Sequence, residues 1–296
     1  MKEFAIIAPT ASGKTALSIA LAHKLDAVIL SLDSLAVYKY IDIASAKPTL
    51  KEREGIVHFG IDKIEPSEQF DVIEFIQEYK EAKEFAKKNN KNLIIVGGTS
   101  FYLKVLIEGL SKIPDISEDT KKQVQASLED IQNSYLMLQK IDPFYMGKIK
   151  QNDRYRIEKA LEVYYQTNMT PTDYFNLNKP KPIIENLPIF QIQTETDILR
   201  ERIKKRTKLM IKEGIIDEVI FLEQNYTRAP NCMSSIGIIE TLQFIDGKIT
   251  KLQLEELIST HTAQLAKRQR SFNRTQFNNI ISENLENLEK KILNMI

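Results

Sequence analysis

The chain has 296 residues, 43% hydrophobic and 27% charged, which is an ordinary globular composition with enough apolar material for a core. Its 41 basic and 40 acidic residues give a net charge of +1, so bulk charge points to no class of partner. The single cysteine excludes an internal disulfide framework and cysteine-rich zinc sites. Because neither a signal peptide nor an apolar run of membrane-spanning length is evident, we expect a cytoplasmic protein.

The N-terminal third alternates between predicted strands and predicted helices. Short apolar runs at 4–8, 27–32 and 92–96 are typical of buried strands. Helical spacing of apolar residues follows the first run at 14–24 and recurs at 71–88. Strands that alternate with helices in this way form a parallel sheet with right-handed connections.

After about residue 113 the alternation of strands and helices stops. Residues 114–182 show short helical patterns, several prolines and no convincing strand, which indicates an all-helical insertion. A strand is predicted again at 187–194. Helices are predicted over most of the remainder, at 196–213, 215–225, 235–244 and 251–273.

Residues 8–15 follow the pattern of a phosphate-binding loop, which reads Gly, four residues and Gly-Lys-Ser/Thr, with Ala8 in the first position. Because a Cβ penalises left-handed backbone, Ala8 can replace this glycine only if its φ is negative. The loop N–H groups and the following helix N-terminus form an anion nest, to which Lys14 adds a charge and Thr15 a hydroxyl suited to Mg²⁺. The predicted phosphate-binding residues are Ala8, Pro9, Thr10, Ala11, Ser12, Gly13, Lys14 and Thr15.

This loop and the alternating pattern together predict an α/β fold, a P-loop NTPase-like parallel sheet flanked by helices with an all-helical insertion domain. The predicted division of the chain has three parts. They are the first part of the P-loop core at 1–112, the helical insertion domain at 113–185, and the return to the core with C-terminal helices at 186–296.

The predicted strand ends carry two further candidate groups. P-loop ATPases usually have an Asp at the end of a second apolar strand, but the strand at 92–96 ends in Gly97-Gly98-Thr99. The strand at 27–32 ends in Asp33, which is either a metal ligand or a base. The loop by itself leaves open an ATP-binding small-molecule or nucleotide kinase.

Two stretches near the C-terminus are locally basic. Residues 200–213 hold seven basic and two acidic side chains, and residues 267–274 hold four basic and none acidic. One such run is usually a solvated helix face, but two in one half favour an RNA- or phosphate-binding surface. Arg202 and Arg206 are four residues apart and therefore share a helix face.

Several stretches in succession resemble the tRNA dimethylallyltransferase family, also called the tRNA isopentenyltransferases. They are APTASGKT (8–15), DSLAVYKYIDIASAKPT (33–49), VGGTSFYLKVLIEGL (96–110), NDRYRIEKALEVY (152–164), RIKKRTKLMIKEG (202–214), SSIGIIE (234–240) and TAQLAKRQRSFNR (262–274). The chain departs from the family pattern at Ala8 for Gly, Ala36 for Gln, Ala44-Ser45 for Gly-Thr, Lys159 for Arg, Ile238 for Tyr and Phe272 for Trp.

The resemblance implies transfer of a dimethylallyl group from dimethylallyl diphosphate to the exocyclic 6-amino group of the adenosine 3′ of the anticodon. It implies a general base at Asp33, donors to the departing diphosphate at Lys14, Thr99, Arg202 and Arg206, and Mg²⁺ at Thr15. Separately, we expect a monomer. The implied tRNA-binding residues are Asp33, Ser34, Leu35, Ala36, Thr99, Lys121, Tyr155, Arg156, Lys159, Lys267, Arg268, Gln269 and Arg274.

Overall fold

The computed structural model describes residues 1–296, which divide into two compact units. Unit 1 comprises 1–107 and 184–296, and unit 2 comprises 108–183. None of the helices combines the length and apolar character needed to span a bilayer.

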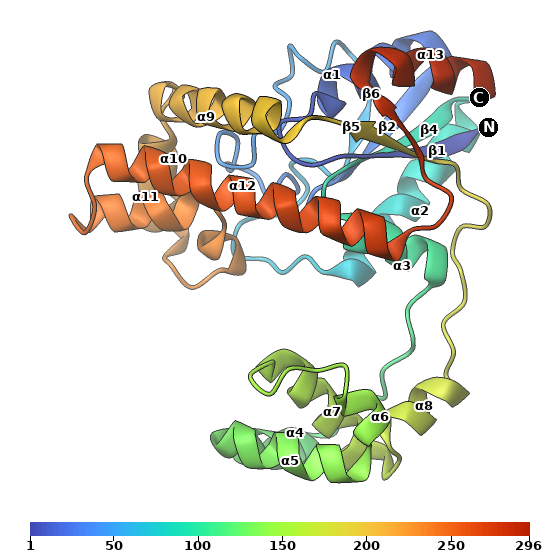
Figure 1. Cartoon of the computed structure of the whole chain (residues 1–296), viewed down its shortest axis with the longest axis vertical. Helices are drawn as coiled ribbons and strands as arrows, with labels where there is room; N and C mark the ends of the chain where they lie inside the picture. The colour runs from blue at the N-terminus through green and yellow to red at the C-terminus, as the bar shows by residue number, and fades with distance from the viewer. The chain divides into compact units, whose positions relative to one another are not determined.

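Unit 1 is built on a six-stranded sheet in which every pairing is parallel, in the order β3-β2-β4-β1-β5-β6 (Figure 1). This confirms the predicted fold class. The strands are β1 (Glu3–Ile7), β2 (Ala27–Leu32), β3 (His58–Phe59), β4 (Asn92–Gly97), β5 (Ile189–Gln193) and β6 (Ile281–Asn284).

Two of these strands have no counterpart in the sequence analysis. β3 has only two residues, and β6 reads ISEN, so neither has the apolar run by which the other four are recognised. Both lie at the edges of the sheet, where one side of the strand stays unpaired and a short or polar segment is tolerated.

The helices of unit 1 follow the predicted pattern where apolar spacing is regular. α11 begins three residues later than predicted because Gly237 has a φ of 94°, which a right-handed helix does not accommodate. The helices are α1 (Lys14–Leu25), α2 (Val72–Lys88), α3 (Ser100–Glu108, its last residue in unit 2), α9 (Thr196–Glu213), α10 (Ile215–Tyr226), η2 (Asn231–Ser234), α11 (Ile238–Ile245), α12 (Lys251–Gln276) and α13 (Leu285–Met295).

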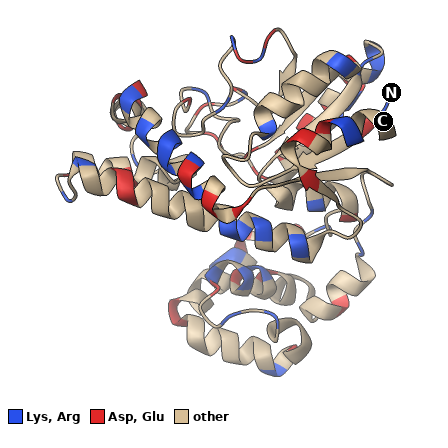
Figure 2. Ribbon diagram, turned by 45° about the horizontal axis from the view of Figure 1, so that its top comes forward, with Lys and Arg blue, Asp and Glu red and all other residues tan.

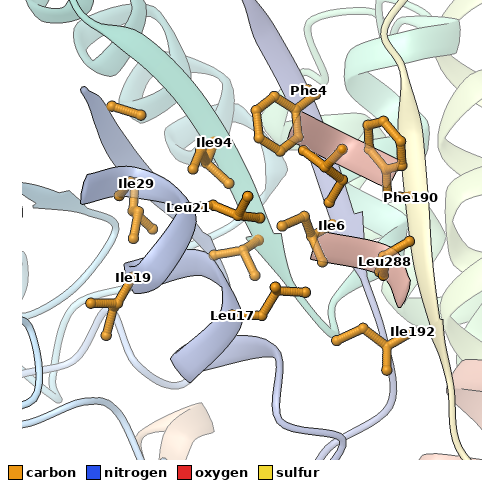
Figure 3. Packing of buried hydrophobic residues seen from close by; sticks show 14 of the residues in the cluster. Phe4, Ile6, Leu17, Ile19, Leu21, Ile29, Ile94, Phe190, Ile192 and Leu288 are labelled. Carbon is orange, nitrogen blue, oxygen red and sulfur yellow. The ribbon is translucent and has the colours of Figure 1, made fainter. Parts of the chain in front are cut away.

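The main core of unit 1 lies between the sheet and the helices α1 and α13 (Figure 3). Leu17 and Leu21 of α1 and Leu288 of α13 are buried against strand residues. Phe4 and Phe190 meet edge to face with their ring centroids 5.7 Å apart. Each buried side chain of this size contributes about 1.5–3 kcal/mol, so this core fixes β1 and α1 at the two ends of the phosphate loop.

Unit 2 is helical and has its own core, in which Val124, Leu138, Ile157 and Leu161 are buried. It begins at Glu108, before the boundary placed at 113 from the sequence, and ends at Ile183. The helices are α4 (Glu118–Ser127), η1 (Leu128–Asp130), α5 (Ile131–Ile141), α6 (Pro143–Met146), α7 (Arg154–Thr167) and α8 (Pro171–Leu177).

Candidate active site

The phosphate loop connects β1 to α1 and has the backbone expected of an anion nest. Ala8 is fully buried and lacks a positive φ, as the replacement of glycine requires, and the left-handed positions are Ala11 at 63° and Gly13 at 93°. The methyl group of Ala11 packs against a small cluster that includes Leu199 and Ile203 of α9. The departure from the family's glycine at position 8 therefore leaves the loop intact.

The ends of β2 and β4 lie beside the loop because β4 pairs with both β1 and β2. Asp33 Oδ1 accepts hydrogen bonds from Leu35 N at 2.9 Å and Ala36 N at 3.2 Å, while Oδ2 has no protein partner. Thr99 Oγ1 accepts from Ser34 N at 3.3 Å. Asp33 thus stabilises its own turn and still presents one free oxygen.

The two arginines predicted to share a face of α9 both contact the loop. Arg202 Nη1 donates to Ser12 O at 3.3 Å. Arg206 Nη1 donates to Thr10 Oγ1 at 3.0 Å and its Nη2 donates to Ala46 O at 3.4 Å. Neither guanidinium has a carboxylate partner, so their charge is available to a bound anion.

Lys14 adds a third positive charge at the same place. Burial and the neighbouring Arg206 lower the pKa of Lys14 to about 8, while the Asp33 carboxylate acts in the opposite direction. Burial also lowers the pKa of Arg206, again against the effect of Asp33. Cations crowded in this way favour a bound polyanion, which would relieve their mutual repulsion.

Gln269 of α12 joins the loop to the turn after β4. Its Oε1 accepts from Thr10 N at 3.0 Å and its Nε2 donates to Gly98 O at 3.1 Å. A Cβ on Gly97 would lie 2.2 Å from the backbone oxygen of Leu32, so this position requires glycine. A Cβ on Gly98 would lie 2.3 Å from Gln269 Nε2 and would displace that amide. Sequence analysis put Gln269 among the RNA contacts, whereas both ends of its amide bind the protein here.

Two hollows meet at this loop. The strand-end hollow, about 600 Å³, is lined by Asp33, Thr99 and a largely apolar wall. The loop-side hollow, about 1380 Å³, is lined by Arg202, residues 11–16 and much of segment 39–54. Apolar residues of the first wall are Ile29, Leu35, Ala36, Ala44, Ala46, Pro48, Ile61, Val96, Phe101, Ile203, Met210, Ile236, Ile258, Leu265 and Phe272. Residues shared by the two hollows are Lys14, Thr15, Ala46, Lys47, Pro48, Arg206 and Met210.

The predicted RNA-contacting cations are of two kinds. In unit 2, Lys121 pairs with Glu118 at 2.7 Å, Lys159 pairs with Glu162 at 2.8 Å, and Arg156 pairs with Asp153. On α12 the exposed side chains of Lys267, Arg268 and Arg274 have no acidic partner. Figure 2 shows the basic positions (blue) gathered toward the C-terminal end of this long helix. Tyr155 is 68% exposed on α7.

Sequence analysis missed one residue that shapes the site. Glu218 of α10 accepts hydrogen bonds from the backbone of residues 42–44, a segment that lines both hollows. No local pattern marks Glu218, because its partners lie more than 170 residues away in the chain.

The fold and this site define a P-loop protein that has a phosphate-binding loop beside an apolar hollow, as a group-transfer enzyme with a phosphate leaving group requires. The IPP transferase family model matches residues 36–276. The chain is 54% identical to the tRNA dimethylallyltransferase of Sulfurovum sp., over 99% of this chain and 98% of the relative. It is 55% identical to the tRNA dimethylallyltransferase of Aliarcobacter butzleri, with the same coverage. The chain therefore belongs to this family of tRNA dimethylallyltransferases, which confirms the resemblance read from its motifs.

Solved structures agree with this assignment. The tRNA isopentenylpyrophosphate transferase of Bacillus halodurans is similar with a TM-score of 0.73 and 29% identity, over 99% of this chain and 95% of that one. A eukaryotic dimethylallyltransferase acting on tRNA is similar with a TM-score of 0.82 and 26% identity, over 97% of this chain and 75% of that one.

Proposed function

We propose that this protein transfers a dimethylallyl group from dimethylallyl diphosphate to the exocyclic 6-amino group of the adenosine 3′ of the anticodon in tRNA. One observation carries the proposal: Lys14 and Arg206 line a largely apolar hollow that also contains an available carboxylate oxygen of Asp33, and Arg202 adds a third cation at the phosphate loop. The allylic C–O bond breaks, the C–N bond forms, the amine proton goes to a base and diphosphate leaves.

Lys14, Arg202 and Arg206 bind the departing diphosphate together with the loop N–H groups. Negative charge grows on the diphosphate as the C–O bond lengthens, and donors already held in position stabilise that charge without reorganising. The contacts of Arg202 with Ser12 and of Arg206 with Thr10 support this role because they fix both guanidinium groups beside the loop. The Thr99 hydroxyl, which accepts from Ser34 N, retains its proton for donation to the same anion.

Asp33 acts as the general base through Oδ2. The N–H groups of Leu35 and Ala36 bind the other oxygen, which fixes the orientation of the carboxylate. An aryl amine is a weak nucleophile until its proton is removed, so a carboxylate held at the reacting nitrogen assists attack on the allylic carbon.

Thr15 suits a Mg²⁺ ion, because its hydroxyl is a hard oxygen donor with no protein partner and its exposed side chain lines both hollows. When bound, the ion would supply further positive charge to the diphosphate oxygens. The residues of this chain bind and orient the diphosphate from the other sides.

The acceptor adenine has to leave the stacked anticodon loop to enter the strand-end hollow. The apolar side chains of Leu35, Ile236 and Phe272 provide a wall against which a base and a prenyl group can pack. The unpaired cations Lys267, Arg268 and Arg274 on α12 are suited to the phosphates of the RNA backbone.

A P-loop kinase is not favoured, since the relatives are named dimethylallyltransferases and the turn after β4 carries no carboxylate. The deciding experiment incubates purified protein, Mg²⁺ and dimethylallyl diphosphate with an unmodified anticodon stem-loop, and follows the RNA by mass spectrometry. We expect one dimethylallyl group on the adenosine 3′ of the anticodon. Phosphoryl transfer from ATP to a small molecule, without alkylation, would contradict the proposal.

A further inference from the structure

Glu218 on α10 binds a segment far away in the sequence. Its Oε2 accepts from Asp42 N at 2.8 Å and Ile43 N at 2.7 Å, and its Oε1 accepts from Ala44 N at 2.9 Å. Three consecutive backbone N–H groups thus converge on one carboxylate, an anion nest filled by a side chain of the protein. Glu218 itself lines neither hollow.

The segment that Glu218 binds has strained backbone at both ends. Tyr40 has a φ of 63° and Ala46 a φ of 49°, both in the left-handed region that non-glycine residues rarely adopt. Such backbone persists only where its surroundings hold it. Lys47 contributes from the other end, pairing with Asp42 at 2.6 Å and donating to Tyr38 O at 2.9 Å.

The same segment separates the two hollows. Residues 42–43 line the loop-side hollow, residues 44–45 line the strand-end hollow, and Ala46 lines both. Ala46 also supplies the carbonyl that accepts from Arg206 Nη2. A displacement of residues 42–44 would therefore move a partner of Arg206 and the wall between the two hollows.

We propose that Glu218 is a positioning residue for group transfer. Its ionised carboxylate holds residues 42–44 so that Arg206 and the wall between the hollows keep the geometry that the reaction needs. This inference rests on the proposed transfer reaction, although its effect on Arg206 is measurable without that reaction.

The ionised form is the one that fits the nest. Burial raises the pKa of Glu218, and its hydrogen bonds from the backbone of residues 42–44 act in the opposite direction. A protonated carboxyl would accept from these N–H groups more weakly, because it carries no charge and one of its oxygens holds the proton. An amide at this position loses one acceptor altogether, because its NH₂ would face one of these N–H groups.

The first test compares Glu218→Gln with Asp217→Asn, which removes the same charge from the adjacent, exposed position of α10. We expect Glu218→Gln to lower the single-turnover transfer rate per folded molecule by roughly tenfold to hundredfold, the effect of a misplacement on the order of 1 Å. The KM for tRNA and the rate of Asp217→Asn should stay near those of the unaltered protein. Equal rates for the two variants would overturn the inference.

A double-mutant cycle with Arg206→Lys separates positioning from a general loss of structure. If Glu218 acts through Ala46 and Arg206, the combined variant should lose much less than the product of the two single losses. If the combined variant instead lost as much as the product of the two single losses, Glu218 would not act through Arg206, and the stated route would be overturned. Melting temperatures of all variants show the fraction of folded protein in each assay.

Binding of inorganic diphosphate with Mg²⁺, measured by calorimetry, keeps this inference apart from the proposed function. We expect Glu218→Gln to weaken diphosphate binding several-fold and Asp217→Asn to leave it unchanged. The unaltered protein could fail to alkylate RNA while Glu218→Gln still bound diphosphate more weakly than Asp217→Asn. That result would contradict the proposed function but support the positioning of Arg206 by Glu218. If the unaltered protein alkylated RNA but the two variants bound diphosphate alike, the positioning role would fall.

Discussion

The two basic helices of unit 1, α9 and α12, are alike in sequence and differ in what their charges contact. They pack side by side (Figure 1). From α9, Arg202 and Arg206 reach the phosphate loop and have no acidic partner. From α12, Lys267 and Arg274 remain exposed and also have no acidic partner. The difference teaches that a count of basic residues identifies a charged helix but does not say which charges enter a site. That depends on the side of the helix from which each residue projects.

The other cations of α9 strengthen the contrast. Arg200 lies 3.9 Å from Asp197, Lys204 lies 3.5 Å from Glu201, and Lys208 lies 3.7 Å from Glu255. Exposed pairs of this kind contribute little energy, but they keep these side chains on the outer face of the helix. Inward charges should therefore govern the chemical step and outward charges the binding of RNA.

The largest effect should come from Asp33, whose carboxylate shares the strand-end hollow with Arg206. Asp33→Asn keeps an oxygen for the N–H groups of Leu35 and Ala36 but removes the base, so turnover should fall by roughly 10²- to 10⁴-fold. Diphosphate binding, measured by calorimetry, should change little. A loss of diphosphate binding would instead make Asp33 a metal ligand.

Arg206→Ala should cause the second-largest loss of transfer rate. Removing one donor to a developing anion lowers the rate by about 10²- to 10³-fold, and tRNA affinity should be unaffected. Lys204→Ala is the matched control on the outward face of the same helix. Similar rates for the two variants in a single-turnover assay would break the distinction between inward and outward charges of α9.

The pH dependence of diphosphate binding should report Lys14. Because its pKa is lowered to about 8, the free protein loses this charge as the pH rises through that value, and diphosphate affinity should fall with it. Calorimetry between pH 7 and pH 9.5 checks this, with Lys14→Arg expected to remove the fall.

The same lowered pKa predicts the sign of a stability change. Between about 8 and the ordinary value of 10.5, the unfolded chain binds more protons at Lys14 than the folded protein does. The contribution of Lys14 to the free energy of unfolding should therefore rise with pH in this window. Denaturant titrations of the ligand-free protein, compared with Lys14→Met, measure it, and a falling difference would contradict the assignment.

The smallest effect on rate should come from the outward cations of α12. Lys267→Ala and Arg274→Ala should weaken tRNA binding and reduce the slope of log affinity against log salt by about 0.7–0.9 for each lost phosphate contact. The transfer rate of these variants at saturating tRNA should equal that of the unaltered protein. Lys208→Ala on α9 is the control, since the Lys208 side chain has an acidic neighbour. An equal change in slope for Lys208→Ala would contradict the distinction between the unpaired cations of α12 and the paired cations of α9.

The sequence predicted the fold class and four of the six strands, because buried parallel strands leave continuous apolar runs. It did not predict β3 or β6, whose pairing is set by neighbouring strands rather than by their own composition. It also identified the phosphate loop, Asp33 and the shared face of Arg202 and Arg206, since motif spacing and helical period are local properties.

By itself, then, the sequence determined a phosphate loop on a parallel sheet, with a carboxylate and a hydroxyl at the neighbouring strand ends. Only the tertiary structure decided that Gln269 joins the loop to the turn after β4 and that Glu218 holds residues 42–44. The physical reason is the range of the interactions. Spacing within a helix or strand is fixed by backbone geometry, whereas these hydrogen bonds join residues 171 to 259 positions apart and exist only once the helices have packed.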